Sequence, residues 1–213
     1  MAARHNVLIR VSKDGLALQY APDELKSNRD IVLTAVRQNG YALEHASDEL
    51  KRDREIVLAA VRQTGFALGH AAQELKNDHE IVLAAVTQSG YALKYATEEL
   101  RSSRTLVMMA VVQYGLALEY AAEELRGEPK IVTAAIGQPY GHALCFAADT
   151  LLQDESFAVT ARENLYFFRV TAMSGRSCVV ASQHLEDREV LLDKSCSKLK
   201  LQRTGSEALL HGA

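Results

Sequence analysis

Aromatic and histidine side chains recur along this chain at steps of 25 residues, with one step of 26 near the end of the series. One set comprises Leu16, Tyr41, Phe66, Tyr91, Leu116 and His142, and a second comprises Tyr20, His45, His70, Tyr95, Tyr120 and Phe146. Large rings of this kind fill the edges of protein cores, and they also anchor partners at interfaces. If the rings share one accessible face, they form a row of binding anchors. The candidate partner-binding residues are therefore Tyr41, Phe66, Tyr91, Tyr20, His45, His70, Tyr95 and Tyr120.

Histidine side chains could support metal binding or proton transfer. His45 and His70 stand at equivalent positions of adjacent units, and equivalent side chains of stacked helices lie about 10 Å apart, too far to share one ion. Glu44 is the nearest carboxylate in register, and no serine or cysteine stands at a matching step to act as a nucleophile. The pattern predicts no metal site, no cofactor and no catalytic residue.

Paired acidic residues recur as well and are each followed by a basic residue. The pairs are Asp23-Glu24, Asp48-Glu49, Glu98-Glu99 and Glu123-Glu124, and the basic residues after them are Lys26, Lys51, Arg101 and Arg126. Adjacent residues of a helix do not face each other, so these acids do not form a general-acid dyad. The pattern is typical of a solvated ridge of alternating charge.

A glutamine stands shortly before the repeated glycine in every unit except the first, which has Lys13 there. The series is Gln38, Gln63, Gln88 and Gln113, with Gln138 in the sixth unit. Identical residues in a repeat array usually serve contacts between neighbouring units, so we interpret the series as a structural ladder of amides. A row that reads a bound ligand is the alternative.

The elements that position these residues follow from the repeat itself. Three series keep the step of 25 residues: Ile31, Ile56, Ile81, Leu106 and Ile131; Gly15, Gly40, Gly65, Gly90 and Gly115; and Leu25, Leu50, Leu75, Leu100 and Leu125. The sixth unit is one residue longer. Six units run from about Asn6 to Gln153, and a seventh begins near Phe157. Such a period predicts an array of stacked supersecondary units.

Each unit is predicted to contain two helices. The first includes 31–36, starts after an N-cap such as Asp53, and ends at the glycine, which we expect to adopt the left-handed conformation of a helix C-terminus. The second includes Ala42 and Ala46. Pro22 stands in the middle of this second helix in the first unit, and because proline disrupts a helix interior, we expect a break there and a short new turn over 47–50.

The block from Asp53 to Leu68, Asp-Arg-Glu-Ile-Val-Leu-Ala-Ala-Val-Arg-Gln-Thr-Gly-Phe-Ala-Leu, resembles the repeat of the family called domain of unknown function 4116. The resemblance extends over most of the chain. It implies an all-helical array and implies no activity.

The C-terminal segment has a different pattern. Residues 166–173 and 177–182 read as strands joined by a turn, 186–199 has helical spacing, and 207–212 reads as a third strand. This order is similar to the first half of a ubiquitin-like β-grasp domain. The chain departs from that family because it stops at Ala213, before the remaining strands and a terminal di-glycine. We therefore divide the chain into a repeat array, 1–164, and a partial β-grasp segment, 165–213.

Composition narrows the functional classes. The net charge of −3 lacks the basic excess typical of proteins that bind duplex nucleic acid. Cys145, Cys178 and Cys196 have neither metal-ligand nor disulfide spacing, which favours a reducing compartment, cytoplasmic or nuclear. No apolar run is long enough to span a membrane.

The sequence thus predicts a mainly α fold, an α-solenoid of 25-residue helical-hairpin repeats with a small C-terminal α+β segment. The leading functional hypothesis is a non-catalytic scaffold that binds a protein or peptide partner. The alternatives are a ubiquitin-pathway adaptor acting through the C-terminal segment, and single-stranded nucleic-acid binding by the helical repeats.

Overall fold

The computed structural model describes residues 2–137, 142–152, 154 and 157, and three strand segments at 166–172, 177–182 and 199–202. The helical part contains six successive units, numbered 1 to 6 below, and each unit holds three helices in the same order. The long helices are α1 (Ala2–Lys13), α3 (Arg29–Gln38), α4 (Arg54–Gln63), α5 (His79–Gln88), α7 (Arg104–Gln113) and α9 (Pro129–Ile136).

A 3-10 helix follows each long helix, and a third, short helix completes the unit. The 3-10 helices are η1 (Gly15–Tyr20), η2 (Gly40–His45), η4 (Gly65–His70), η6 (Gly90–Tyr95), η7 (Gly115–Tyr120) and η8 (His142–Phe146). The short helices are α2 (Asp23–Lys26), η3 (Leu50–Arg52), η5 (Leu75–Asn77), α6 (Glu98–Arg101), α8 (Glu123–Arg126) and α10 (Asp149–Leu152). The predicted helical repeat is confirmed, but its second helix is of the 3-10 type.

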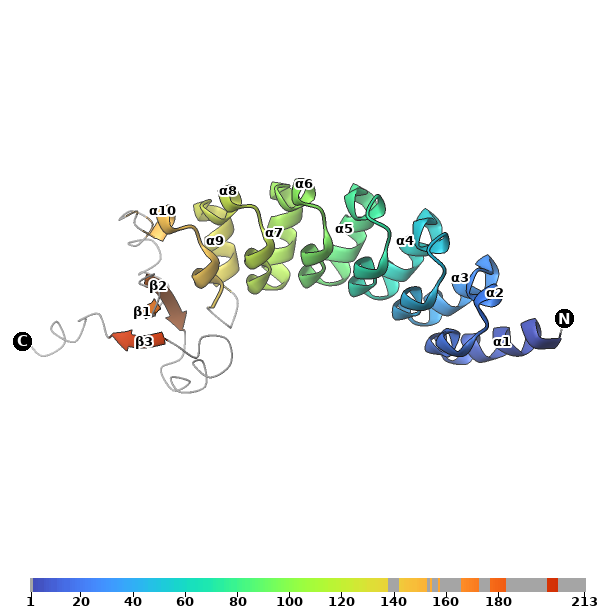
Figure 1. The fold of residues 1–213 in the computed structure, drawn as a ribbon. Helices are drawn as coiled ribbons and strands as arrows, with labels where there is room; N and C mark the ends of the chain where they lie inside the picture. Colours follow the sequence, from blue (N-terminus) through green and yellow to red (C-terminus); the bar gives the residue numbers. More distant parts are fainter. Residues whose placement is uncertain are drawn as a thin grey trace, which may run out of the picture.

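The units stack side by side in an arched row, with the short helices along the outer side of the arch (Figure 1). Each long helix contacts the long helix of the next unit, and each 3-10 helix contacts the next 3-10 helix. The array therefore has a layer of long helices and a layer of 3-10 helices. Neither layer is stable alone, because helices of this length depend on packing of their apolar faces.

One continuous apolar core lies between the two layers. In unit 2, the side chains of Ile31, Val32, Ala35 and Val36 are fully buried on the inner face of α3, and Leu43 is fully buried beneath them. The same positions are buried in every unit from 2 to 5. Repetition of one apolar pattern thus builds a core that extends from unit to unit.

The repeated glycine has a different role from the one expected. The expected left-handed conformation is wrong: Gly40 is the first residue of η2, and the residue that ends α3 is Asn39, with an extended backbone (φ −148°, ψ 114°). A Cβ on Gly40 would lie 2.4 Å from the carbonyl oxygen of Ala60 in the next unit. Glycine is required because two units approach each other there, which a sequence motif of one unit does not reveal.

The predicted break in the middle of the second helix is present. The 3-10 helix η1 ends at Tyr20, Ala21 is extended (ψ 148°), and the short helix α2 begins after Pro22. In unit 2, the equivalent short helix holds the buried Leu50. At the breaks of units 2 to 6, a backbone amide also joins neighbouring units, as in the hydrogen bond from Ala72 N to Lys51 O at 3.0 Å.

Three strands form an antiparallel sheet in the order β2-β1-β3: β1 (Tyr166–Ala172), β2 (Ser177–Ser182) and β3 (Leu199–Gln202). Tyr166 pairs with Ser182 in the β1–β2 ladder, and Arg169 pairs with Gln202 in the β1–β3 ladder. The first two strands lie where the sequence predicts them. The helix expected over 186–199 is described only at Leu199, which begins β3, and the strand expected over 207–212 lies outside the described residues. The resemblance to a β-grasp domain stays a prediction.

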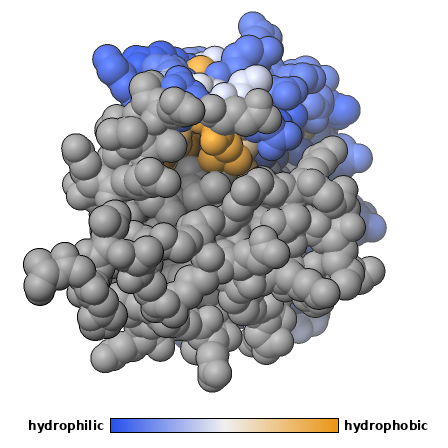
Figure 2. All heavy atoms as spheres, turned by 90° about the vertical axis from the view of Figure 1, so that its left-hand side faces the viewer, coloured by the Kyte–Doolittle hydropathy of each residue, from blue (hydrophilic) through white to orange (hydrophobic). Residues whose placement is uncertain are grey.

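Two further observations concern the surface. No helix among the described residues is long and apolar enough to cross a membrane. Seen from the C-terminal end of the array, hydrophobic residues show between hydrophilic ones (Figure 2).

Candidate functional site

Five rings of units 3 to 5 form a connected group, called the aromatic cluster below: Phe66, Tyr91, Tyr95, Tyr114 and Tyr120. Tyr91 lies at its centre, with ring centroids 5.8 Å from Phe66, 5.5 Å from Tyr114 and 5.2 Å from Tyr120. Phe66 also meets Tyr95 at 6.4 Å in an edge-to-face arrangement. These separations are typical of favourable aromatic pairs. The cluster thus spans three units of the 3-10 layer.

Tyr91 and Tyr120 also share a hydrogen bond between their hydroxyl groups, with the two oxygens 2.7 Å apart. Burial raises the pKa of Tyr120, and hydrogen bonds with Tyr91 and Glu119 raise it further. Both effects favour the neutral phenol. Tyr120 therefore keeps its hydroxyl proton to higher pH than an ordinary tyrosine, and its hydrogen bond positions the ring of Tyr91.

Lys94 is the one cation at the cluster among the described residues. Its ammonium nitrogen lies 5.9 Å from the ring centroids of Tyr91 and Tyr120 and 6.0 Å from that of Tyr95. At this range a cation is attracted by the negative face of an aromatic ring. The site thus combines apolar rings, hydroxyl groups and one exposed positive charge.

One contact recurs between successive 3-10 helices, and the side chains that make it differ from unit to unit. The residue before the last position of a 3-10 helix lies near the last residue of the next 3-10 helix. Lys94 meets Tyr120 in this way, and a Cβ on Gly69 would lie 2.9 Å from the ring of Tyr95. Gly69 therefore leaves space for the Tyr95 ring, which a larger side chain would displace.

In units 2 and 3 the equivalent positions hold Glu44 and His70, and the charge of Glu44 acts on the imidazole of His70. Burial lowers the pKa of His70, the charge of Glu44 opposes this effect, and the charges of Lys51, Lys76 and His45 add to it. His70 is therefore held in its neutral form at neutral pH. Within the described residues, no group of three histidine, cysteine or acidic side chains could hold a metal ion.

The structure brings together only half of the candidate residues. Phe66, Tyr91, Tyr95 and Tyr120 belong to the aromatic cluster, whereas His45 of unit 2 and His70 of unit 3 lie outside it. Tyr20 is 71% exposed and Tyr41 is 41% exposed, and neither ring contacts another ring among the described residues.

Tyr114 and Lys94 were not among the candidates. Tyr114 ends α7 at a position where other units have a small polar residue, namely Asn39, Thr64 and Ser89. The sequence therefore does contain a signal for Tyr114, namely a large ring where the other units have a small polar side chain. Departures from a repeat mark what one unit does differently from the others, so they are informative about sites.

The repeated glutamines connect neighbouring units. Gln38 accepts a hydrogen bond from the backbone amide of Gly15 (2.6 Å) and donates one to the carbonyl oxygen of Lys13 (3.3 Å). Gln113 makes the equivalent bonds to Gly90 N (2.6 Å) and Thr87 O (2.6 Å). Gln63 donates to Gln38 O (3.4 Å) and Gln88 accepts from Gly65 N (2.7 Å), so all four amides bond the backbone of the preceding unit.

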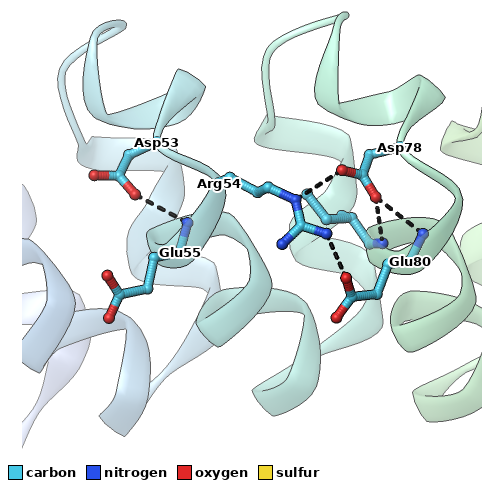
Figure 3. Close-up of polar contacts among 6 residues, drawn as sticks. Asp53, Arg54, Glu55, Asp78 and Glu80 are labelled. Carbon is cyan, nitrogen blue, oxygen red and sulfur yellow. Dashed lines mark hydrogen bonds and ion pairs between the residues drawn. The ribbon is translucent and has the colours of Figure 1, made fainter.

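A second ladder runs along the opposite ends of the long helices, and the sequence analysis missed it. Arg54 of unit 3 donates hydrogen bonds to Asp78 (2.9 Å) and to Glu80, both of unit 4 (Figure 3). Asp78 also accepts from the amides of Glu80 (2.9 Å) and Ile81 (3.1 Å) as the N-cap of α5. The arginine thus holds an acid that already caps the next helix.

The unit before repeats this arrangement, with Arg29 bound to Asp53 (2.9 Å) and Glu55. Burial is the largest single influence on the pKa of Asp53 and raises it, but the hydrogen bonds from Arg29 and from the amides of Ile56 and Glu55 together outweigh burial and lower it. The signal for this ladder was available in the sequence, because Arg29 and Arg54 each stand 24 residues before an aspartate and 26 residues before a glutamate, namely Asp53 with Glu55 and Asp78 with Glu80.

The family comparison accounts for the first four units. The model of the family described as Domain of unknown function (DUF4116) matches residues 4–51 and 53–101. This part of the chain belongs to that family. No curated protein and no solved structure matches the chain. Each DUF4116 match covers two of the 25-residue units: the first covers units 1 and 2, and the second covers units 3 and 4.

The aromatic cluster extends beyond the second DUF4116 match. Phe66, Tyr91 and Tyr95 lie inside this match, whereas Tyr114 and Tyr120 lie in unit 5, after it ends at residue 101. The junction between units 4 and 5 also departs from the arginine ladder. His79 replaces the arginine, and Ser103 and Thr105 replace the two acids. Aromatic contacts thus replace ion pairs where the array leaves the matched region.

Proposed function

We propose that the chain is a non-catalytic scaffold that binds a protein or peptide partner at the aromatic cluster. The observation that carries this proposal is the set of four ring contacts centred on Phe66 and Tyr91, together with the 39% exposure of Tyr114. Aromatic side chains that are partly accessible and held in one geometry are the residues that dominate binding at interfaces.

Preorganisation supports the same proposal. The ring of Tyr91 is fixed by its hydroxyl bond to Tyr120, and the ring of Tyr95 is seated over Gly69. Ordering a side chain on binding costs about 0.5–1.5 kcal/mol, so rings that are already ordered leave more of the contact energy for affinity. The stacked units supply the rigid base that such a site needs.

The test is a quantitative capture experiment with the full chain as bait. Wild-type protein, Tyr114→Ala and Tyr20→Ala are compared on the same lysate, and captured proteins are quantified by mass spectrometry. Tyr20 is an exposed tyrosine at the far end of the array and provides the matched control. We expect a partner that Tyr114→Ala loses and Tyr20→Ala retains. If both variants retain every protein that the wild type captures, the aromatic cluster is not the binding site.

A further inference from the structure

The ends of the long helices form a second surface that adjoins the aromatic cluster, called the helix-end edge below. At units 1 to 3 this edge carries the exposed basic side chains Arg10, Lys13, Arg37 and Arg62. At unit 4 the equivalent position holds Thr87, and at unit 5 it holds Val112, which is 53% exposed and stands two residues before Tyr114. The edge therefore changes along the array from basic to apolar.

The four basic side chains make no ion pair with any residue that the structure describes. By contrast, Arg29, Arg54 and Arg104 on the opposite edge are all bound to carboxylates. The only acid at the same helix ends in units 1 to 3 is Asp14, whose carboxylate accepts the amide of Leu16. A chain with a net charge of −3 thus keeps an uncompensated positive edge.

The favourable interaction of cations with a helix C-terminus does not by itself explain this edge. The helices α5 and α7 each have ten residues, as α3 and α4 do, yet they have no basic residue in the last turn. If the helix dipole required these cations, units 4 and 5 would carry them too. The basic residues occur at units 1 to 3, and of these units only unit 3 contributes a ring, Phe66, to the aromatic cluster.

The helix-end edge and the aromatic cluster are continuous. Tyr41 and Phe66 lie four residues after Arg37 and Arg62, at the beginning of the 3-10 helix that follows each long helix. Phe66 contacts Tyr91, which contacts Tyr114. A partner lying across the units would therefore meet positive charges first and rings afterwards.

On the basis of the proposed function, we propose that the partner is a linear peptide segment with acidic residues at one end and apolar residues at the other. The acidic end lies along Arg37 and Arg62, and the apolar end lies on the aromatic cluster. Stacked helices are about 9 Å apart and an extended peptide advances about 3.3 Å per residue. The acidic residues are therefore expected at every third position of the segment.

Charge complementarity favours an acidic peptide over single-stranded nucleic acid. The helix-end edge offers a positive charge about once per unit, at Arg37 and Arg62, and it turns apolar at Val112. A polyphosphate carries a negative charge on every residue, and most of these charges would find no partner along the edge. A peptide with an acidic residue at every third position of one half and apolar residues in the other half matches the charges of the helix-end edge and the rings of the aromatic cluster.

The experiment measures binding of synthetic 15-residue peptides to the full chain by fluorescence anisotropy. The first peptide has aspartate at every third position of one half and leucine and phenylalanine in the other half. The second has lysine in place of each aspartate, and the third has serine there. An oligothymidylate of 15 nucleotides is the fourth probe.

Two variants with the same change of charge test the location. Arg62→Glu alters the helix-end edge, and Arg52→Glu alters an exposed arginine on the short helix of unit 2. We expect Arg62→Glu to weaken binding of the aspartate peptide roughly tenfold at low salt, and Arg52→Glu to weaken it much less. A gain-of-function variant, Thr87→Arg, extends the basic edge by one unit and should tighten binding of the aspartate peptide.

The possible outcomes separate the two proposals. Equal affinity for the aspartate, serine and lysine peptides, or equal effects of the two glutamate variants, overturns the acidic-segment inference and leaves peptide binding at the aromatic cluster in place. Tighter binding of the oligonucleotide than of any peptide overturns the inference in favour of nucleic acid. Failure of all three peptides to bind at about 1 mM overturns both proposals.

Discussion

The junction between units 2 and 3 and the junction between units 4 and 5 share a backbone arrangement but differ in side-chain chemistry. In both, an amide of one unit bonds the carbonyl of the preceding short helix at 3.0 Å, and a glycine lies close to the next long helix. The first junction adds the ion pairs of Arg29, and the second adds the ring contacts of Tyr91. The backbone thus builds the array, and the side chains decide what each junction presents.

The two kinds of junction are expected to serve different purposes, one the stability of the array and the other the binding of a partner. Exposed ion pairs join two units without creating a surface that a partner can use, because each charge is already bound. Partly exposed rings join two units and still present apolar area to solvent. We therefore expect the ion-pair junctions to behave as structural joints and the aromatic junction to behave as a binding site.

The largest effect is expected at the glycines, and it should be the same at both junctions. A Cβ on Gly40 would lie 2.4 Å from Ala60 O, and a Cβ on Gly90 would lie 2.4 Å from Ala110 O. Because the obstacle is backbone, Gly40→Ala and Gly90→Ala should each lower the free energy of unfolding by about 1–3 kcal/mol or more. Urea denaturation followed by circular dichroism measures this loss.

The control for the glycines is Gly127→Ala, where the nearest atom to the added Cβ is 3.5 Å away. This change should stay within about 0.5 kcal/mol of wild type. A loss at Gly127 as large as that at Gly40 would show that the close approach is not the cause.

The next effect sharpens the difference between the junctions. Tyr91→Ala removes a half-buried ring that contacts three other rings, and it should lower the free energy of unfolding by about 1–3 kcal/mol. Tyr41→Ala, at the equivalent position of unit 2, removes no ring contact and should lower the free energy of unfolding by roughly 0.5 kcal/mol or less. Urea denaturation at low and at high salt gives both values, and the Tyr91 loss should not depend on salt. Equal losses for the two tyrosines would remove the distinction between the junctions.

A smaller, salt-dependent effect is expected at the arginine ladder. Arg29→Gln should lower the Tm at low salt, and the difference from wild type should shrink in 1 M NaCl, because the ion pairs are exposed. A complementary triple variant, His79→Arg with Ser103→Asp and Thr105→Glu, introduces the missing ion pairs between units 4 and 5. This triple variant should gain salt-dependent stability, and a gain that persists in 1 M NaCl would contradict the ion-pair explanation.

The smallest effect concerns pH at units 2 and 3. The pKa of His70 is lowered from its ordinary 6.5, chiefly by burial, so the folded state favours the neutral ring. The stability that this provides is complete above pH 6.5 and is lost as the pH falls through the lowered pKa. His70→Gln should therefore show a shallower decline in Tm between pH 7 and pH 5 than wild type. Parallel curves for the two proteins would show that His70 does not titrate with folding.

Much of the fold could be predicted from the sequence, because the array repeats one pattern of local signals. Apolar spacing, N-caps such as Asp53 and the proline at position 22 each act within one unit, and the long helices and the break after the 3-10 helix follow from them. The 3-10 geometry of the second helix and the reason for Gly40 did not follow. Both depend on how closely the next unit approaches, which is a property of two units together.

The candidate site could be predicted only in part, for the same physical reason. Recurrence pointed to Phe66, Tyr91, Tyr95 and Tyr120, but it also included Tyr20, which has no neighbouring ring. Tyr114 and the edge from Arg37 to Val112 are departures from the repeat. A search for recurrence passes over such departures, although they are what distinguishes one unit from the next.

The most direct test of the central claim is hydrogen exchange of the full chain with and without the aspartate peptide, read by mass spectrometry. We predict slower exchange on binding at the end of α5 and in η6, at the end of α7 and in η7, where the amides support Tyr91, Tyr114 and Tyr120. Exchange in η1, which supports Tyr20, should not change. Protection confined to η1 and the short helices would contradict the account, because it would place the partner away from the aromatic junction.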